Sequence, residues 1–576
     1  MKKSFKRFCQ IFTFSLGLVS ATVHADGLSD EVFGILSNRC HSCHGVELKH
    51  EKLNVLEHSI LIGDRGDEDK MPYVTPGNLE ESKLWQVIVD EQMPPKQPLP
   101  AEEQEKIKAW ILDGAAWTIE TDREFISETD VLRLIERDLS DRPLNEQEFQ
   151  RYFSITHLHN NGSVPDRDLR IYRAALSKAL NSMSDRPKIT LPVAINDEST
   201  IFRIDLRDYG WTGSSQWQAI QELYPYGLKP LSNVKNDELF TKIMRIYGDF
   251  SGVRLPYLRA DWFVATATRP PLYHELAKIP EQLDDLVERL SVDIEGNFQQ
   301  SSSRRVGLFE SGVSGQNRMI EYLDSSSGRF WLSYDFLGKS GRSNLALFPL
   351  GPEFDGNTFN SFAFEHAGGE IIYELPNGLH GYMLIDGEGE RIPAGPIEIV
   401  WDALNVSGSP LIVNGLSCMS CHRRGILPLE DYVRNGATLV QPNAMRKVRE
   451  LYPPQSEIDE AVADSSQRYI AKLRQTIGSF VDLESDPNLE KLEEPVSRVA
   501  LLYAKSLDLE AIACELGLEN TADVQSLIKR EVTLGLGPIG SKGGTVKRSY
   551  WESQDGATSV LQDTAEKLKL GSAVVF

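Results

Sequence analysis

Two cysteine pairs, each followed directly by a histidine, constrain this chain more than any other feature. They read Cys40-His41-Ser42-Cys43-His44 and Cys418-Met419-Ser420-Cys421-His422. Two thiols three residues apart on a helical turn can form thioether bonds to the vinyl groups of one haem, and the adjacent imidazole can then bind the iron. The motifs therefore predict two covalently bound haems c, attached through Cys40, Cys43, Cys418 and Cys421 and bound by His44 and His422.

The cysteine pairs also allow three other interpretations, one of which is that either pair occurs by chance. Their four thiols together could bind one structural zinc ion, and either pair alone could form a redox disulfide of the thioredoxin type. Zinc does not require a histidine after each pair, and neither motif follows a convincing strand, as a thioredoxin-type site would. The other two of the six cysteines, Cys9 and Cys514, do not suggest a disulfide-stabilised scaffold. The spacing favours haem.

The first 25 residues predict export. A basic start is followed by a mostly apolar run from 8 to 21 and by the small-residue cleavage pattern Val23-His24-Ala25. This order is typical of a cleaved secretory signal peptide, and the run is shorter than the roughly 20 apolar residues that span a bilayer. An uncleaved N-terminal anchor is the alternative. We expect a periplasmic or otherwise exported protein whose mature chain has no membrane span.

Charge and length limit the partners and the number of domains. The net charge is −23, and removal of the basic leader makes it more negative. Such a surface repels nucleic acid, whereas it suits a basic redox partner protein or simply promotes solubility. Since a single hydrophobic core stops growing near about 250–300 residues, 576 residues predict several domains.

A set of short segments surrounds the first motif in a fixed order. They are Ile35-Leu36-Ser37-Asn38-Arg39 before it, Gly45 after it, then Pro76-Gly77-Asn78-Leu79-Glu80-Glu81-Ser82, Met93-Pro94-Pro95-Lys96 and Trp110-Ile111-Leu112-Asp113-Gly114-Ala115. Together they resemble planctomycetal-type cytochrome c domains over about residues 28–118. The resemblance implies a small helical cytochrome c whose haem iron is bound by a histidine and a methionine.

The residues themselves agree with this resemblance. Residues 31–38 and 101–113 have the pattern of amphipathic helices that can pack together. Met93 precedes two prolines, which exclude a helix, so its thioether can be held on a loop over the first haem. Met93 is our predicted sixth ligand. Met71, also followed by a proline, is the competing ligand. Alternatively, Met93 only fills space in the hydrophobic core.

The middle of the chain, residues 119–410, predicts a mixed α and β region. Apolar residues at helical spacing predict a helix over 166–183, alternation predicts a strand over 202–206, and β-rich runs between turns predict an antiparallel sheet over about 303–400. His366 stands beside glycines that allow close backbone approach, so it is our tentative distal ligand for the second haem. His274 ranks second.

The C-terminal region, residues 411–576, predicts helices over about 443–451, 456–476, 494–506, 508–516 and 522–532 around the second haem. No Met-Pro-Pro loop follows the second motif, and Met445 falls on a predicted helix, so this haem lacks an obvious sixth ligand. Arg423 and Arg424 either pair with haem propionates or form a solvated basic spot.

The expected fold class is therefore multidomain α+β. It comprises a signal peptide (1–25), an all-α cytochrome c domain (26–118), a central region with an antiparallel sheet (119–410) and a helical region with the second haem (411–576). The primary functional hypothesis is electron transfer between the haems and an external partner. The alternative is a di-haem peroxidase or oxygenase with its active centre at the second haem. A third hypothesis makes the central region a binding module and the haems sensory.

Overall fold

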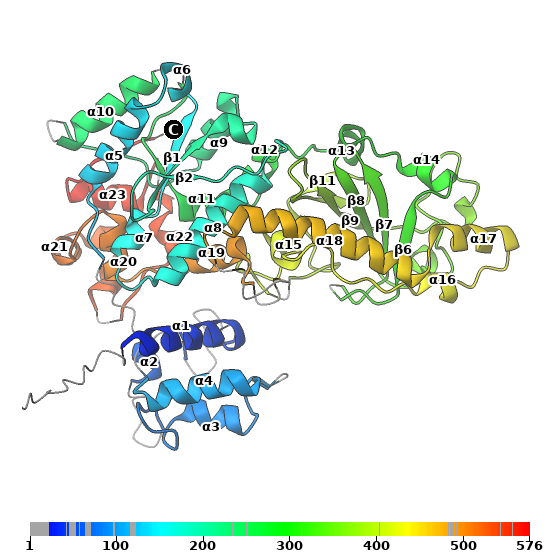
Figure 1. Cartoon of the computed structure of the whole chain (residues 1–576), viewed down its shortest axis with the longest axis horizontal. Coiled ribbons are helices and arrows are strands. Elements are labelled where there is room, and N and C mark those ends of the chain that lie inside the picture. The colour runs from blue at the N-terminus through cyan, green and yellow to red at the C-terminus, as the bar shows by residue number, and fades with distance from the viewer. Residues whose placement is uncertain are drawn as a thin grey trace, which may run out of the picture. The chain divides into compact units, whose positions relative to one another are not determined.

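The computed structural model describes residues 22–41, 43–44, 53–56, 58–63, 71–95, 98–115, 123–232, 235–248, 251–312, 314–402, 404–481, 483, 489, 492–541, 543–555 and 557–575. The chain divides into two compact units, Met1–Thr121 and Asp122–Phe576 (Figure 1). Residues 1–21, most of the predicted signal peptide, lie outside the described residues. Among the described helices, none is both long and apolar enough to cross a membrane.

The first unit is helical, as predicted for a cytochrome c domain. Its described helices are α1 (Thr22–Arg39), α2 (His58–Leu61), α3 (Lys83–Val89) and α4 (Ala101–Leu112). The predicted pairing of the first and last helices is confirmed, since α1 packs against α4 around a core that includes Leu36, Ile107 and Trp110. Helix α1 begins at Thr22 rather than at Glu31, because no proline interrupts 22–30 and the single Gly27 costs only about 1 kcal/mol in a helix.

The second unit begins with helices around a small mixed sheet. The sheet has the order β2 (Val193–Ala194), β3 (Ile201–Asp205), β1 (Gln150–Ser154) and β5 (Leu258–Arg259), with β1 and β5 parallel. The helices of this part are α5 (Glu128–Ser140), α6 (Leu144–Gln147), α7 (Thr156–Asn160), α8 (Asp166–Ser182), α9 (Ser214–Glu222), α10 (Lys235–Tyr247), α11 (Ala260–Ala267) and α12 (Leu272–Leu276). The next two helices, α13 (Leu283–Leu290) and α14 (Ile294–Gln299), lie beside the second sheet (Figure 1).

Two of the sequence predictions fall in this part. The predicted helix over 166–183 is α8, whose apolar face is buried. The predicted strand over 202–206 ends one residue early, because the side chain of Asp205 accepts a hydrogen bond from the Arg207 backbone N–H (3.0 Å) and caps a short 3₁₀ helix that begins at Leu206.

The predicted antiparallel sheet is present as six strands in sequential order. They are β6 (Arg304–Leu308), β7 (Arg318–Ser325), β8 (Gly328–Asp335), β9 (Gly368–Glu374), β10 (His380–Asp386) and β11 (Arg391–Ile392). The turn clusters seen in the sequence connect β7 to β8, β9 to β10 and β10 to β11. Trp331 and Tyr334 are buried on opposite faces of β8, so these aromatic residues build the core, as expected.

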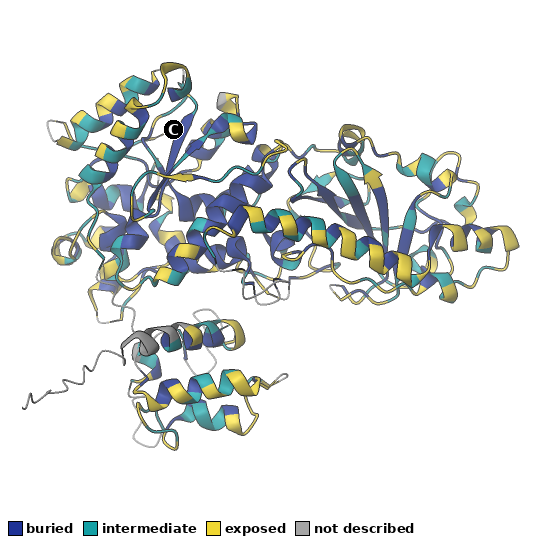
Figure 2. Cartoon of the chain, viewed as in Figure 1, coloured by how far each residue is buried: buried dark blue, intermediate teal, exposed yellow. Residues whose placement is uncertain are grey.

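The helices predicted after the second motif are present with closely similar bounds. They are α17 (Pro442–Leu451), α18 (Gln455–Ile477), α19 (Pro495–Tyr503), α20 (Leu509–Glu515) and α21 (Ala522–Arg530). The structure adds four short helices that were not predicted: α15 (Leu416–Cys421), α16 (Val433–Gly436), α22 (Arg548–Trp551) and α23 (Val560–Lys567). Helix α18 runs along the six-stranded sheet (Figure 1). It buries one side against the sheet and exposes the other (Figure 2), which explains its amphipathic sequence.

The C-terminal segments are interleaved with the central ones. Helix α19 packs against α8 and α11, and Lys178 of α8 forms a buried ion pair of 2.7 Å with Glu494, the N-cap of α19. Near the end of the chain, β16 (Ser572–Ala573) pairs with β4 (Leu228–Lys229). Residues on both sides of position 410 therefore share one compact unit.

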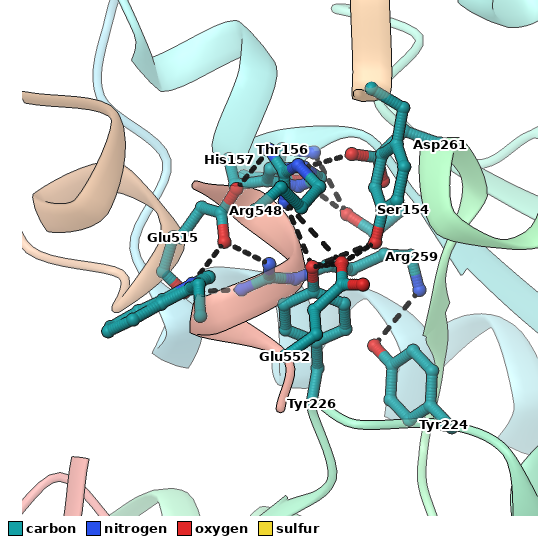
Figure 3. A network of polar contacts seen from close by, with 12 residues as sticks. Ser154, Thr156, His157, Tyr224, Tyr226, Arg259, Asp261, Glu515, Arg548 and Glu552 are labelled. Carbon is teal, nitrogen blue, oxygen red and sulfur yellow. Dashed lines mark hydrogen bonds and ion pairs between the residues drawn. The ribbon is translucent and has the colours of Figure 1, made fainter. Parts of the chain in front are cut away.

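A buried polar network ties this unit together (Figure 3). Glu515 of α20 is bound by Arg548 of α22 (2.7 Å) and by Arg259 of β5 (2.9 Å). Arg548 also donates to the Tyr226 hydroxyl (2.9 Å), and Asp261 of α11 pairs with His157 of α7 (3.0 Å). Because these charges come from distant parts of the sequence and neutralise one another, the network fixes how the C-terminal helices dock.

Candidate functional site

The first motif continues the last turn of α1. The Cys40 backbone N–H donates to the Leu36 carbonyl (3.0 Å), and the His44 N–H donates to the Cys40 carbonyl (2.9 Å). This turn presents two thiols and one imidazole from a short stretch of backbone, as haem attachment requires. At the same end of α1, Arg39 forms a two-fold hydrogen bond to Glu103 of α4 (2.9 and 3.0 Å) and so fixes the motif to the neighbouring helix. Ser42 lies outside the described residues.

Met93 lies four residues after the end of α3. Its backbone N–H donates to the Val87 carbonyl (3.0 Å), and its side chain is 39% exposed. It is thus on an accessible loop next to a proline, as the sequence predicted, and is not a core filler. Its role as a ligand of the first haem stays a prediction.

The second motif occupies the buried helix α15. Cys418 is 1% exposed, whereas Cys421 is partly accessible. The helix begins after Gly415, whose φ is +84° and where a Cβ would lie 2.6 Å from the Thr268 carbonyl oxygen. Only glycine fits here, so the entry to the motif is fixed by close contact with the neighbouring chain.

The imidazole of His422 is oriented in the way that a haem ligand requires. Its Nδ1 lies 3.1 Å from the carbonyl oxygen of Gly425, so Nδ1–H donates to this carbonyl and Nε2 is the ring nitrogen that remains to bind a metal ion. The His422 N–H donates to the Cys418 carbonyl (2.8 Å), which keeps the ring on the turn that bears the thiols. The donor set therefore fits a c-type haem.

The Nε2 atom of His422 faces the six-stranded sheet. Glu370 of β9 places its Oε1 atom 3.7 Å from Nε2, and the ring of Tyr382 on β10 lies with its centroid 6.3 Å from that of His422. Burial alone raises the pKa of Glu370, but His422 beside it and the charge of Arg318 outweigh burial and lower the pKa to about 2. At neutral pH this group is an ionised carboxylate.

A second histidine lies on the same sheet. His380 begins β10, is 2% exposed and stacks on Tyr469 of α18 with ring centroids 4.3 Å apart. Burial, followed by the charge of His422, lowers the pKa of His380 to about 3, so its imidazole is neutral. Within the parts that the structure describes, no group of three or more His, Cys, Asp and Glu side chains is placed to hold a metal ion by itself.

His366, the tentative distal ligand, lies just before β9. Its ring contacts Tyr334 (centroids 5.0 Å apart) and Phe364, and it lines a cavity of about 500 Å³ together with Arg305. Tyr334 lies on one face of β8 and Trp331 on the other. The ring N–H of Trp331 donates to the hydroxyl of Ser465 on α18. The structure therefore brings Glu370, and not His366, next to His422. The ligand role of His366 stays an untested prediction.

His274, the second-ranked candidate, is linked to the motif through a hydrogen bond. Its Nε2 lies 2.9 Å from the Asn414 side-chain nitrogen, and the Asn414 oxygen lies 4.0 Å from the Cys418 sulfur.

Arg423 donates to the Leu492 carbonyl (3.3 Å), and both Arg423 and Arg424 are exposed. Met445 falls on α17, as predicted.

The protonation state of His274 makes the stability of the fold depend on pH. Burial and the charge of Arg391 lower its pKa from the ordinary 6.5 to about 4. Between these values the unfolded chain binds a proton that the native chain does not, so stability falls as the pH drops through this window. Between pH 7 and pH 5, we expect the free energy of unfolding to fall by about 1–2 kcal/mol less in His274→Gln than in the parent chain, after allowance for solvent screening. Denaturant midpoints at both pH values measure this difference, and equal losses in the two chains would contradict it.

Sequence reasoning missed Glu370, Tyr382 and Tyr469. One signal was available: the run Gly368-Gly369-Glu370-Ile371-Ile372-Tyr373-Glu374 places two carboxylates four residues apart, and so on one face, of an otherwise apolar strand. A charged residue on a buried strand usually has a specific partner. The partner itself, His422, depends on the docking of α15 against β9, which no local pattern encodes.

Comparison with known proteins bears on the first unit. Residues 40–97 match the family described as planctomycete cytochrome C, as the resemblance predicted. This segment contains Cys40, Cys43, His44 and Met93. No curated protein and no solved structure matches the chain. The second motif lies outside the matched segment.

Proposed function

We propose that this protein is an exported di-haem c-type cytochrome that transfers electrons. The observation that carries the proposal is the geometry of His422. It stands at the end of a thiol-bearing turn, with Nδ1 against a backbone carbonyl and Nε2 directed away from it. The family match of residues 40–97 supports one haem, and the identical motif form together with this geometry supports the second.

The proposed roles of the residues follow from their chemistry. Cys40 and Cys43 attach the first haem, and His44 and Met93 bind its iron; Cys418 and Cys421 attach the second haem, and His422 binds its iron. Each bound haem supplies the one-electron chemistry. The chain supplies burial of the thiols, the orientation of each imidazole and, at the second motif, a fixed carboxylate beside the histidine.

The compartment and partner are part of the proposal. The N-terminal pattern supports export by a cleaved signal peptide, and thioether attachment keeps a haem in place outside the cytoplasm. The net charge of −23 supports a basic redox protein as partner, since opposite charge speeds encounter at low ionic strength.

Peptide mapping tests the proposal directly. After proteolysis of the exported protein, the peptides that contain residues 40–44 and 418–422 are expected to carry haem that acidified acetone does not extract. Alkylation of Cys514 in the same digest serves as a control for a cysteine without haem. If the peptide with 418–422 is free of haem, the protein is a mono-haem cytochrome, and the second half of the proposal fails.

A peroxidase or oxygenase centred on the second haem is the alternative function. Glu370 favours it, because a carboxylate near the iron is a group that can move protons during catalysis. Peroxide added to the oxidised protein separates the two. An electron carrier is expected to show no peroxide-dependent oxidation of a reduced redox dye above the free-haem background, whereas saturable turnover would favour the enzyme.

Substitution of Met93 tests the first haem alone. In Met93→Ala, the weak far-red absorption that arises from methionine sulfur bound to ferric haem is expected to vanish, because the thioether is the sixth ligand in this proposal. Met71→Ala is the matched control and should retain the band. If Met93→Ala keeps the band and Met71→Ala loses it, the two methionines exchange roles.

A further inference from the structure

We infer that Glu370 would be the second protein ligand of the iron in a haem held by Cys418, Cys421 and His422. This inference rests on the proposed function, because it needs a haem at Cys418 and Cys421. It assigns the coordination position for which the sequence offered no methionine and only a tentative histidine.

The distance between the two side chains is the first argument. A first-row metal ion binds nitrogen and oxygen ligands at about 2 Å, so two ligands on opposite sides of one iron lie about 4 Å apart. The Oε1 atom of Glu370 and the Nε2 atom of His422 are 3.7 Å apart. This is longer than a hydrogen bond and close to the separation of two axial ligands. The hydrogen bond of Nδ1 to Gly425 leaves Nε2 as the nitrogen that faces the carboxylate.

The position of Glu370 is the second argument. It lies in the middle of a six-stranded sheet, opposite Leu384 of β10, and its backbone N–H donates to the Ser333 hydroxyl (2.9 Å). Next to it, Arg318 is engaged by Asp335 (2.5 Å), so its guanidinium is already paired with another carboxylate. The backbone thus holds Glu370 rigidly, and its side chain retains 17% exposure beside His422.

The competing histidines are placed less well. His366 contacts Tyr334, whose side chain lies on one face of the sheet. Tyr382 lies on the other face, and this is the face that meets His422. His380 lies on the same face as Glu370 but pairs with Glu374, four residues further along β9, and its ring is stacked on Tyr469. The Oε1 atom of Glu370 lies 3.7 Å from His422 Nε2.

Imidazole titration of the full chain tests the assignment. A Cys40→Ala/Cys43→Ala background leaves only the second haem, and absorption spectroscopy follows its coordination. An internal ligand that occupies the iron about 90% of the time weakens an external ligand about tenfold. Glu370→Ala is therefore expected to bind imidazole about tenfold tighter or more than the background chain. Glu365→Ala, which removes an exposed carboxylate, and His366→Ala should both bind imidazole as the background chain does.

A gain-of-ligand variant keeps the test independent of folding losses in Glu370→Ala. In Glu370→His, a second imidazole is expected to produce a low-spin spectrum without added ligand, whereas Glu374→His should not. Unchanged imidazole affinity in Glu370→Ala, or a tenfold gain in His366→Ala or His380→Ala instead, would overturn the inference. Haem content is measured in every sample as its pyridine complex. Loss of covalent haem in the background chain would count against the proposed function rather than against Glu370.

Discussion

The double variant Cys418→Ala/Cys421→Ala is expected to retain half of the covalently bound haem of the parent chain. Thioether bonds are the only covalent links between haem and chain in this account, so removal of both thiols of one motif removes one haem. The readout is the ratio of haem to protein after extraction with acidified acetone, measured on protein recovered from the periplasm.

Matched variants make this result specific. Cys40→Ala/Cys43→Ala is expected to give the same half ratio, and the chain without all four thiols should carry no covalent haem. Cys514→Ala, which removes a buried cysteine outside both motifs, should keep the full ratio. If the Cys418→Ala/Cys421→Ala chain retains as much haem as the parent, the second motif does not attach haem.

Replacement of Arg548 is expected to have the largest effect on stability. Arg548→Met removes the guanidinium that binds Glu515 (2.7 Å) and the Tyr226 hydroxyl (2.9 Å) in the buried network of Figure 3. Breaking a buried ion pair by removal of one partner leaves an uncompensated charge and costs about 3–5 kcal/mol. Denaturant unfolding of the full chain, followed by far-ultraviolet circular dichroism, measures the loss.

The control for Arg548 is an arginine at the surface. Arg530→Met removes the same charge from the exposed end of α21 and is expected to change stability by less than about 0.5 kcal/mol. An Arg548→Met chain that unfolds at the same denaturant concentration as Arg530→Met would show that the network contributes little to docking of the C-terminal helices.

Much of the local structure could be predicted from the sequence. The bounds of α8, α17 and α18 follow from apolar residues at helical spacing, because each helix buries one face. The six-stranded sheet could be predicted from β-rich runs separated by turn residues, since its strands pair in sequential order. The start of α1 was less predictable, because nothing local ends a helix between Thr22 and Glu31.

The long-range arrangement could not be predicted from these patterns. The pairing of β16 with β4 and the ion pair between Lys178 and Glu494 join residues hundreds of positions apart. Local spacing contains no information on such contacts, because an edge strand or a charged side chain could pair with any of several partners. The same limit applies to Glu370: its strand was predicted, but its neighbour His422 depends on how α15 docks against the sheet.

The two motifs illustrate the same contrast. Spacing alone predicts attachment at Cys40 and Cys418, because thioether chemistry is local. The second iron ligand is not encoded locally, so sequence reasoning was left to choose among histidines and favoured His366. The ring of His366 contacts Tyr334, and its role as a ligand stays a prediction. Met93, on a loop before a proline, is the exception in which a predicted ligand distant in sequence has a local signature.

The intact mass of the exported, purified chain tests the central claim most directly. The account predicts a mature chain that lacks its signal peptide and is heavier than the bare polypeptide by two haem groups under denaturing conditions. A mass equal to that of the bare polypeptide, or a colourless preparation that contains zinc, would contradict it.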